Sequence, residues 1–160
     1  MCPLRPVVPL LLGMLTVIPA FAAKQSLLLG TWTIDLSKLT MPGPPKRVTI
    51  VFADAGSGKY KMTVDIIDHD GTTRQAASLF KTDGTPARQL GNADYDVVSM
   101  TMPSRRILVM GGGFAGHPGN TRVFSLSDDG KNMIETVVSH GRDRTPHTRV
   151  DIWNRAKSPD

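Results

Sequence analysis

The chain has 160 residues, of which 40% are hydrophobic, and a formal net charge of +5. This length fits one domain with a substantial core, and the single cysteine, Cys2, excludes an internal disulfide and a cysteine metal site. The positive residues are scattered rather than gathered into one run, which favours a generally basic surface over a dedicated anion-binding patch.

Residues 1–22 have the pattern of an export signal. Arg5 lies in a short first part, residues 7–18 are apolar, and small residues follow at the positions where a signal peptidase cleaves. Ala20 and Ala22 occupy the −3 and −1 positions of that cleavage site. We therefore expect a signal peptide over 1–22.

A retained membrane anchor is the alternative interpretation of this segment. Even taken as far as Ala23, the stretch 7–23 is only about 17 residues long and contains Pro9 and Pro19, whereas a spanning helix needs roughly 20 residues. We expect a mature domain over 23–160 that is periplasmic or secreted, with no stable membrane insertion. For such an exported domain we expect no nucleic-acid partner, although its basic surface could attract anionic lipids or polymers without specificity.

The mature chain consists of short β-type runs separated by glycine turns. Asp-Gly pairs supply the positive φ angles of tight hairpins, and no helical period appears, apart from one turn that residues 36–39 could form. In chain order the expected strands are 27–34, 47–53, 59–68, 73–82, 95–102, 105–111, 121–127, 132–140 and 148–154.

The alternation within these runs indicates which faces are buried. In 47–53 and 59–68 apolar and polar residues alternate, so each run has one buried and one solvated face. In 95–102, 105–111 and 132–140 apolar residues face both ways, as they would if the outside were also covered. An open meander of this length would leave two unpaired edges. The sequence therefore predicts an all-β fold, a single antiparallel up-and-down β-barrel of about 8–10 strands.

Two irregular segments interrupt the series of runs. Pro42, Pro44 and Pro45 force an extended connection, which we expect to cross one end of the barrel. The glycine-rich stretch 111–120 lacks a Lys-Ser/Thr pair and a following helix, so it matches no nucleotide-binding loop. We interpret it as a mobile flap beside the opening of the barrel.

The first mature strand carries the most recognisable motif, Leu-Leu-Gly-Thr-Trp-Thr-Ile at 28–34, followed by Asp-Leu-Ser-Lys at 35–38. This opening resembles the Gly-x-Trp first strand of the lipocalin and fatty-acid-binding-protein superfamily. It is more closely similar to small exported bacterial lipocalin-like proteins, in which Leu-x-Gly-Thr-Trp precedes an Asn/Asp-x-x-x-Ser/Lys connection. The resemblance implies a lipocalin-like, calycin-type barrel over the mature chain.

The resemblance also assigns barrel-closing roles. Gly30 allows the strand to bend across the barrel end, and the indole of Trp32 plugs that end. In lipocalins an arginine from the last strand region packs over this tryptophan, which implies Arg149 or Arg155 here; a cation–π contact would account for the pair.

Fatty-acid binding is less well supported by the same comparison. Cytosolic fatty-acid-binding proteins hold the ligand carboxylate with a C-terminal Arg-x-Tyr pair. If Arg149 corresponds to the arginine of that pair, Asp151 stands at the position of the tyrosine. If Trp153 corresponds to the aromatic residue, Asp151 stands at the position of the arginine. Either register puts a carboxylate where the ligand's own carboxylate would lie, and the helical lid of that family is missing.

We expect no cofactor and no metal. The run Asp68-His69-Asp70 carries ligand groups, but the glycine after it is typical of a hairpin tip. His117, His140 and His147 fall in or beside expected loops and could converge at one rim. There a haem-binding histidine is the alternative to solvated side chains.

We also expect no enzymatic activity. The serines of the expected strands lack the Gly-x-Ser-x-Gly elbow of a hydrolase. Asp65, Asp96 and Asp151 could pair for glycoside cleavage, but the sequence does not define their separation.

Two functions from different classes remain. The first is binding of a small apolar molecule inside the barrel; the second is a packed barrel without a cavity that serves the cell envelope as a structural or interaction module. An interior pocket of at least about 300 Å³ would favour the first. In either case we expect a monomer. The lining expected for a binding cavity is Phe52, Tyr60, Met62, Val64, Met100 and Met110.

Overall fold

The structure is a computed structural model, and it describes residues 26–91, 95–141 and 143–157. The expected signal peptide, with Ala20 and Ala22, lies outside the described residues. The described elements are β1 (Gly30–Ile34), the 3-10 helix η1 (Leu36–Lys38), β2 (Arg47–Asp54), β3 (Tyr60–Ile67), β4 (Thr73–Phe80), β5 (Ala87–Gly91), β6 (Val97–Ser104), β7 (Ile107–Phe114), β8 (His117–Leu126), β9 (Asn132–His140) and β10 (Pro146–Arg155).

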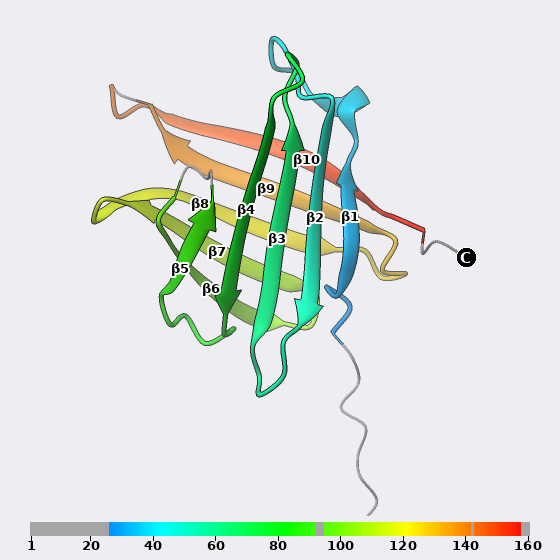
Figure 1. The fold of residues 1–160 in the computed structure, drawn as a ribbon, viewed down its shortest axis with the longest axis vertical. Coiled ribbons are helices and arrows are strands. Elements are labelled where there is room, and N and C mark those ends of the chain that lie inside the picture. The colour runs from blue at the N-terminus through cyan, green and yellow to red at the C-terminus, as the bar shows by residue number, and fades with distance from the viewer. Residues whose placement is uncertain (1–25, 92–94, 142, 158–160) are drawn as a thin grey trace, which may run out of the picture.

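The ten strands form one closed antiparallel barrel (Figure 1). Each strand pairs with its neighbours in sequence, and β1 pairs with β10, with Trp32 opposite Arg155 and Ile34 opposite Trp153. The predicted all-β, up-and-down barrel of about 8–10 strands is therefore confirmed, as is a single helical turn after the first strand.

One strand was not expected from the sequence. β5 pairs with β4 through three residues and with β6 through Ala87 opposite Val98 and Arg88 opposite Val97. Its one buried side chain is that of Gln89, so no alternation of apolar and polar residues marks it as a strand.

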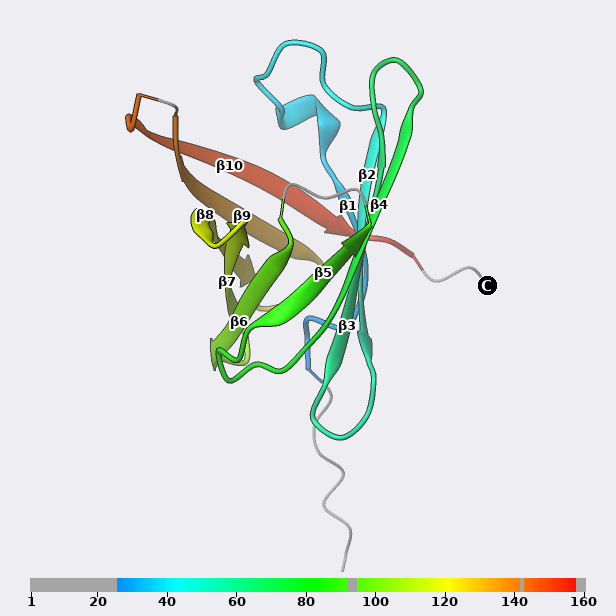
Figure 2. The same cartoon turned by 60° about the vertical axis from the view of Figure 1, so that its left-hand side comes forward.

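Antiparallel pairing gives the barrel two ends of different character. Figure 2 shows η1 and the loop after it at the same end as the β3–β4 turn, whereas the β2–β3 turn lies at the opposite end. We call the first the open end, made by the loop 39–46 and the turns at 68–72, 115–116 and 141–145. The other is the closed end, made by residues 26–29, the turns at 55–59 and 127–131, and Arg155.

Trp32 plugs the closed end. Its side chain is fully buried, and its indole Nε1 donates a hydrogen bond to the carbonyl of Leu28 at 2.9 Å. The Arg155 guanidinium lies over the ring, with Cζ 4.2 Å from the ring centroid, and donates to the carbonyls of Leu27, Leu29 and Gly130. Of the two arginines left open by the sequence, Arg155 therefore takes the place over the indole.

Gly30 makes this contact possible for a reason that the motif did not reveal. Its φ is +129°, a conformation that L side chains rarely adopt, and a Cβ there would lie 2.5 Å from Nη1 of Arg155. The glycine is therefore required for the close approach of the arginine as well as for the bend of β1.

Large side chains fill the closed half of the barrel. The rings of Phe52 and Phe124 meet edge to face with centroids 6.2 Å apart, and Tyr60 stacks on Phe80 at 5.9 Å. Trp32 completes this aromatic layer, which packs the interior of the closed half. A more open hollow of about 610 Å³ lies at this end, with Leu27, Phe52 and Arg155 among its lining residues.

The expectation of a mobile flap over residues 111–120 was wrong. These residues continue β7 and β8, which form a hairpin that turns at Ala115-Gly116. At least one of the glycines has a steric reason, because a Cβ on Gly112 would overlap the ring of Tyr95.

The expected cover over the outer face of the later strands is not supplied by the described part of the chain. Ile134, Val138 and Val150 lie on the outside of β9 and β10 with 47%, 39% and 52% of their surface exposed. These strands are apolar on both faces without being buried on both.

Replacing Arg155 by lysine should destabilise the barrel. A lysine ammonium cannot present a planar fork of donors to three carbonyls, and it stacks less well on an indole. We expect the free energy of unfolding to fall by about 2–3 kcal/mol, measured by urea unfolding with tryptophan fluorescence. Arg106→Lys is the control, because Arg106 pairs at the same end with the exposed Asp128 and should cost at most about 1 kcal/mol. Equal losses for the two variants would contradict the role given to Arg155.

Candidate functional site

A cavity of about 330 Å³ occupies the open half of the barrel. Its mouth is formed by the loop after η1 through Leu39, Met41, Gly43 and Pro45. Its apolar wall includes Ile34, Ile50, Met62, Val64, Met110 and Phe124, and its polar wall includes Gln89, Tyr95, Arg122, Glu135, Arg149 and Asp151.

The structure brings only part of the expected lining to this cavity. Met62, Val64 and Met110 line it. Phe52, Tyr60 and Met100 do not, which corrects the sequence-based expectation: Phe52 and Met100 are buried in the packed core, and Tyr60 lies at the closed-end start of β3. The pattern identified inward-facing positions, but it did not indicate how far along the barrel each one lies.

The charged lining was missed because interior positions were sought among apolar residues. Along β8 to β10, side chains two residues apart share a face, so Arg122 lies with Phe124, and Asp151 lies with Trp153. Glu135 and Asp151 are direct partners across the β9–β10 pairing, so the inner wall carries two carboxylates side by side. Like charges in this arrangement destabilise a sheet unless cations neutralise them.

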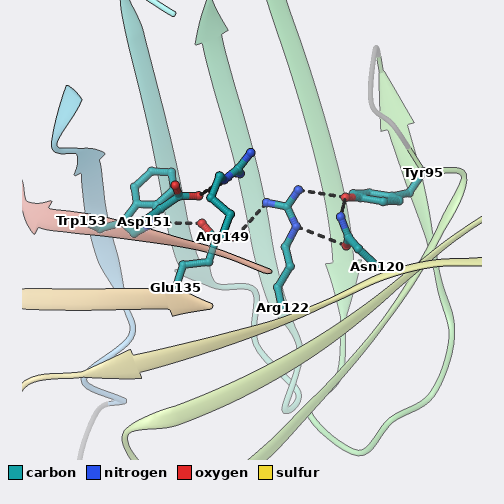
Figure 3. A network of polar contacts seen from close by, with 7 residues as sticks. All are labelled: Tyr95, Asn120, Arg122, Glu135, Arg149, Asp151 and Trp153. Carbon is teal, nitrogen blue, oxygen red and sulfur yellow. Dashed lines mark hydrogen bonds and ion pairs between the residues drawn. The ribbon is translucent and has the colours of Figure 1, made fainter. Parts of the chain in front are cut away.

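Glu135 is neutralised by Arg122, as Figure 3 shows. Arg122 Nη1 donates to Oε1 of Glu135 at 2.8 Å, and Nε1 of Trp153 donates to Oε2 at 2.9 Å. Both carboxylate oxygens thus have a partner although the side chain is completely buried. The far side of Arg122 donates to the hydroxyl of Tyr95 at 2.9 Å, with Asn120 beside it.

Asp151 is neutralised by Arg149, the residue that the sequence had offered as a tryptophan partner. Arg149 Nε donates a hydrogen bond to Oδ2 of Asp151 at 2.9 Å, and Nη2 lies 2.8 Å from the same oxygen as an ion pair. The Asp151 side chain is 1% exposed, and its other oxygen, Oδ1, has no hydrogen-bond partner. The carboxylate that the fatty-acid-binding comparison placed near the ligand head therefore lines the cavity.

Burial and ion pairing shift the pKa of Glu135 in opposite directions. Burial raises the pKa of Glu135 above its ordinary value of 4.5, and the nearby Asp151 adds to this, whereas Arg122 and the Trp153 N–H oppose it. For Arg122, burial lowers the pKa of the guanidinium, but Glu135 and Tyr95 outweigh burial and leave that pKa raised. Arg122 therefore stays charged.

The glycines of the β7–β8 hairpin make room for Tyr95. A Cβ on Gly112 would lie 2.7 Å from the tyrosine ring, and one on Gly119 would lie 2.9 Å from the carbonyl of Gly112. The ring in turn lies within 5.6 Å of Arg122 Cζ. The glycine-rich stretch is thus a cradle for an aromatic residue that positions an arginine of the site.

The two carboxylates that the sequence offered as alternative metal ligands interact with nearby residues of the chain. Asp68 forms an ion pair with Arg74 at 2.7 Å, which lowers the pKa of that carboxyl, and Asp70 accepts the backbone N–H of Thr72. Within 26–91, 95–141 and 143–157, no group of three metal-ligating side chains lies close enough to hold an ion. His117, His140 and His147 lie at the open end but do not line the cavity.

No protein-family model matches this chain, and no curated protein matches it either. The closed antiparallel barrel is compatible with the lipocalin-like resemblance, and membership of that group stays a prediction. In the part of the chain that the structure describes, no helix has the length and apolar character needed to cross a membrane.

The contact between Gly112 and Tyr95 can be tested by a double-mutant cycle. Gly112→Ala should lower the free energy of unfolding by about 1–3 kcal/mol, because its methyl group overlaps the ring. The same change combined with Tyr95→Ala should cost less than the sum of the two single changes, as urea unfolding would show. Gly111→Ala, which meets only the side chain of Ser99, is the matched control. Additive losses for Gly112 and Tyr95 would exclude the cradle.

The raised pKa of Glu135 predicts a pH dependence of stability. The carboxyl group of Glu135 binds a proton more tightly in the folded state than in the unfolded state. The stability that this protonation contributes is fully present below about pH 4.5 and is lost as the pH rises through the folded-state pKa. Wild type should therefore lose stability relative to Glu135→Gln as the pH rises from 4 to 7, measured by urea unfolding at each pH. A difference that grows in favour of wild type would mean that the ion pair with Arg122 outweighs burial.

Proposed function

We propose that this protein is an exported, lipocalin-like binder that holds one small, mainly apolar molecule inside its barrel. The observation that carries the proposal is the cavity of about 330 Å³ in the open half. Its size lies at the lower end of the range for small-molecule sites, and its mixture of an apolar wall with a few convergent polar groups is typical of them.

The competing function, a packed barrel that serves the cell envelope, requires side chains that fill the whole interior. Such filling is found only in the closed half, where Trp32, Phe52 and Phe124 meet. The space in the open half therefore favours the binder. We further propose that the protein acts outside the cytoplasm as a monomer, without a cofactor, a nucleic-acid partner or catalysis.

The charges of the cavity support an uncharged ligand. Arg122 is paired with Glu135, and Arg149 with Asp151, so the four groups together carry no net charge. An apolar molecule that enters displaces water from Met62, Val64 and their neighbours without separating any ion pair. The burial of each ligand methylene is worth about 0.8 kcal/mol.

Filling the cavity should abolish binding. Val64 points into the cavity and Thr63 beside it points outward, so Val64→Trp tests the site and Thr63→Trp is the control on the same strand. With the neutral probe N-phenyl-1-naphthylamine, we expect saturable fluorescence enhancement at one probe per chain for wild type and Thr63→Trp, and a loss of at least about tenfold in affinity for Val64→Trp. The circular dichroism of each variant checks the fold. Equal probe binding by the two tryptophan variants, or none by wild type, would overturn the proposal.

A further inference from the structure

The polar groups of the cavity point to the chemistry of the ligand's head, an inference that rests on the proposed binding function. Two of the residues that line the cavity, Asp151 and Gln89, each carry a buried oxygen without a hydrogen-bond partner: Oδ1 of Asp151 and Oε1 of Gln89. Both side chains are more than nine-tenths buried, at 1% and 7% exposure. Buried acceptors without donors cost free energy, because water no longer solvates them.

The arginines of the site are already engaged. All three nitrogens of Arg122 have partners in Glu135, Tyr95 and Asn120. Arg149 directs two nitrogens at the single oxygen Oδ2 of Asp151. Arg74, which also lines the cavity, is paired with Asp68. An anionic head at any of these arginines would therefore lie beside the carboxylate with which that arginine is already paired.

The two carboxylates add a repulsive element. Glu135 and Asp151 are opposite one another on the inner wall, so a negatively charged head placed near Oδ1 would meet oxygens of like charge and no donor of its own. A head that donates a hydrogen bond and carries no negative charge meets an attractive partner there instead.

We propose that the ligand is a short apolar chain ending in an uncharged hydrogen-bond donor, such as a primary alcohol, and that Asp151 Oδ1 accepts from it. The chain of the ligand lies against the wall formed by Ile50, Met62 and Val64. Asp151 thus selects against fatty acids and for donors of the same length.

Three ligands with similar chains test this selectivity by displacement of N-phenyl-1-naphthylamine. 1-Decanol donates a hydrogen bond, 1-methoxynonane has the same number of heavy atoms but no donor, and decanoate is an anion. We expect wild type to bind decanol about tenfold more tightly than either of the others, as one hydrogen bond to a charged acceptor predicts. Decanoate or the ether binding as well as decanol would overturn the inference.

Asp151→Asn should remove the preference. The asparagine oxygen must stay toward Arg149, which turns the amide N–H₂ into the cavity and replaces an acceptor with a donor. The ratio between decanol and the ether should fall to about one, and decanoate should gain affinity because a carboxylate has been lost. Asp128→Asn is the matched control: it also removes a carboxylate paired with an arginine, but at the exposed closed end, and it should leave the ratio unchanged.

Asp151→Leu keeps the comparison decisive if Asp151→Asn fails to fold. It removes both carboxylate oxygens, the half-exposed Arg149 stays in contact with solvent, and the ratio between decanol and the ether should again fall to about one. An unchanged ratio in whichever of the two variants folds would overturn the inference. If the probe itself does not bind wild type, the proposed function fails; if the probe binds but decanol gains nothing over the ether, only the head-group inference fails.

Discussion

The stacking of Arg155 on Trp32 is the contact on which the rest of the barrel depends. It joins the last strand to the first at the point where the sheet must close, and its three hydrogen bonds satisfy the partly buried carbonyls of Leu27, Leu29 and Gly130. Because Gly30 has no side chain, the guanidinium can reach these groups from inside the sheet. One end of the barrel is thereby sealed, and any interior space has to open at the other.

The charged groups of the open half have a different physical status. Ion pairs in protein interiors seldom stabilise a fold better than well-packed apolar residues would, because each charge loses its hydration. Arg122, Glu135 and Asp151 therefore gain little for the barrel as a fold. Their arrangement is intelligible as the construction of a site: the two carboxylates require two arginines, and one of the carboxylates keeps a free oxygen directed at the cavity.

Much of the fold could be predicted because the barrel follows the period-2 rule in β2 and β3, and because the Gly-Thr-Trp opening marks the first strand. β5 was not predicted because its inward residue is Gln89. The charged lining of the cavity was not predicted because the same rule assigns polar residues to the outside of the barrel. Arg149 and Arg155 could not be separated either. They are six residues apart, so both face inward, and only the length of the pairing with β1 determines which one reaches Trp32.

The glycine-rich hairpin shows how backbone space can control the chemistry of a site at a distance. Gly112 and Gly119 do not line the cavity, yet the missing side chain of Gly112 admits the ring of Tyr95, and that of Gly119 admits the carbonyl of Gly112. That ring and its hydroxyl hold Arg122, and Arg122 holds one oxygen of Glu135 while Trp153 holds the other. Both oxygens of Glu135 therefore have their donors in Arg122 and Trp153, and neither depends on a donor from the side of Asp151. A segment that resembles a flexible loop in sequence thus forms part of the wall, because Gly112 admits the aromatic ring that holds Arg122.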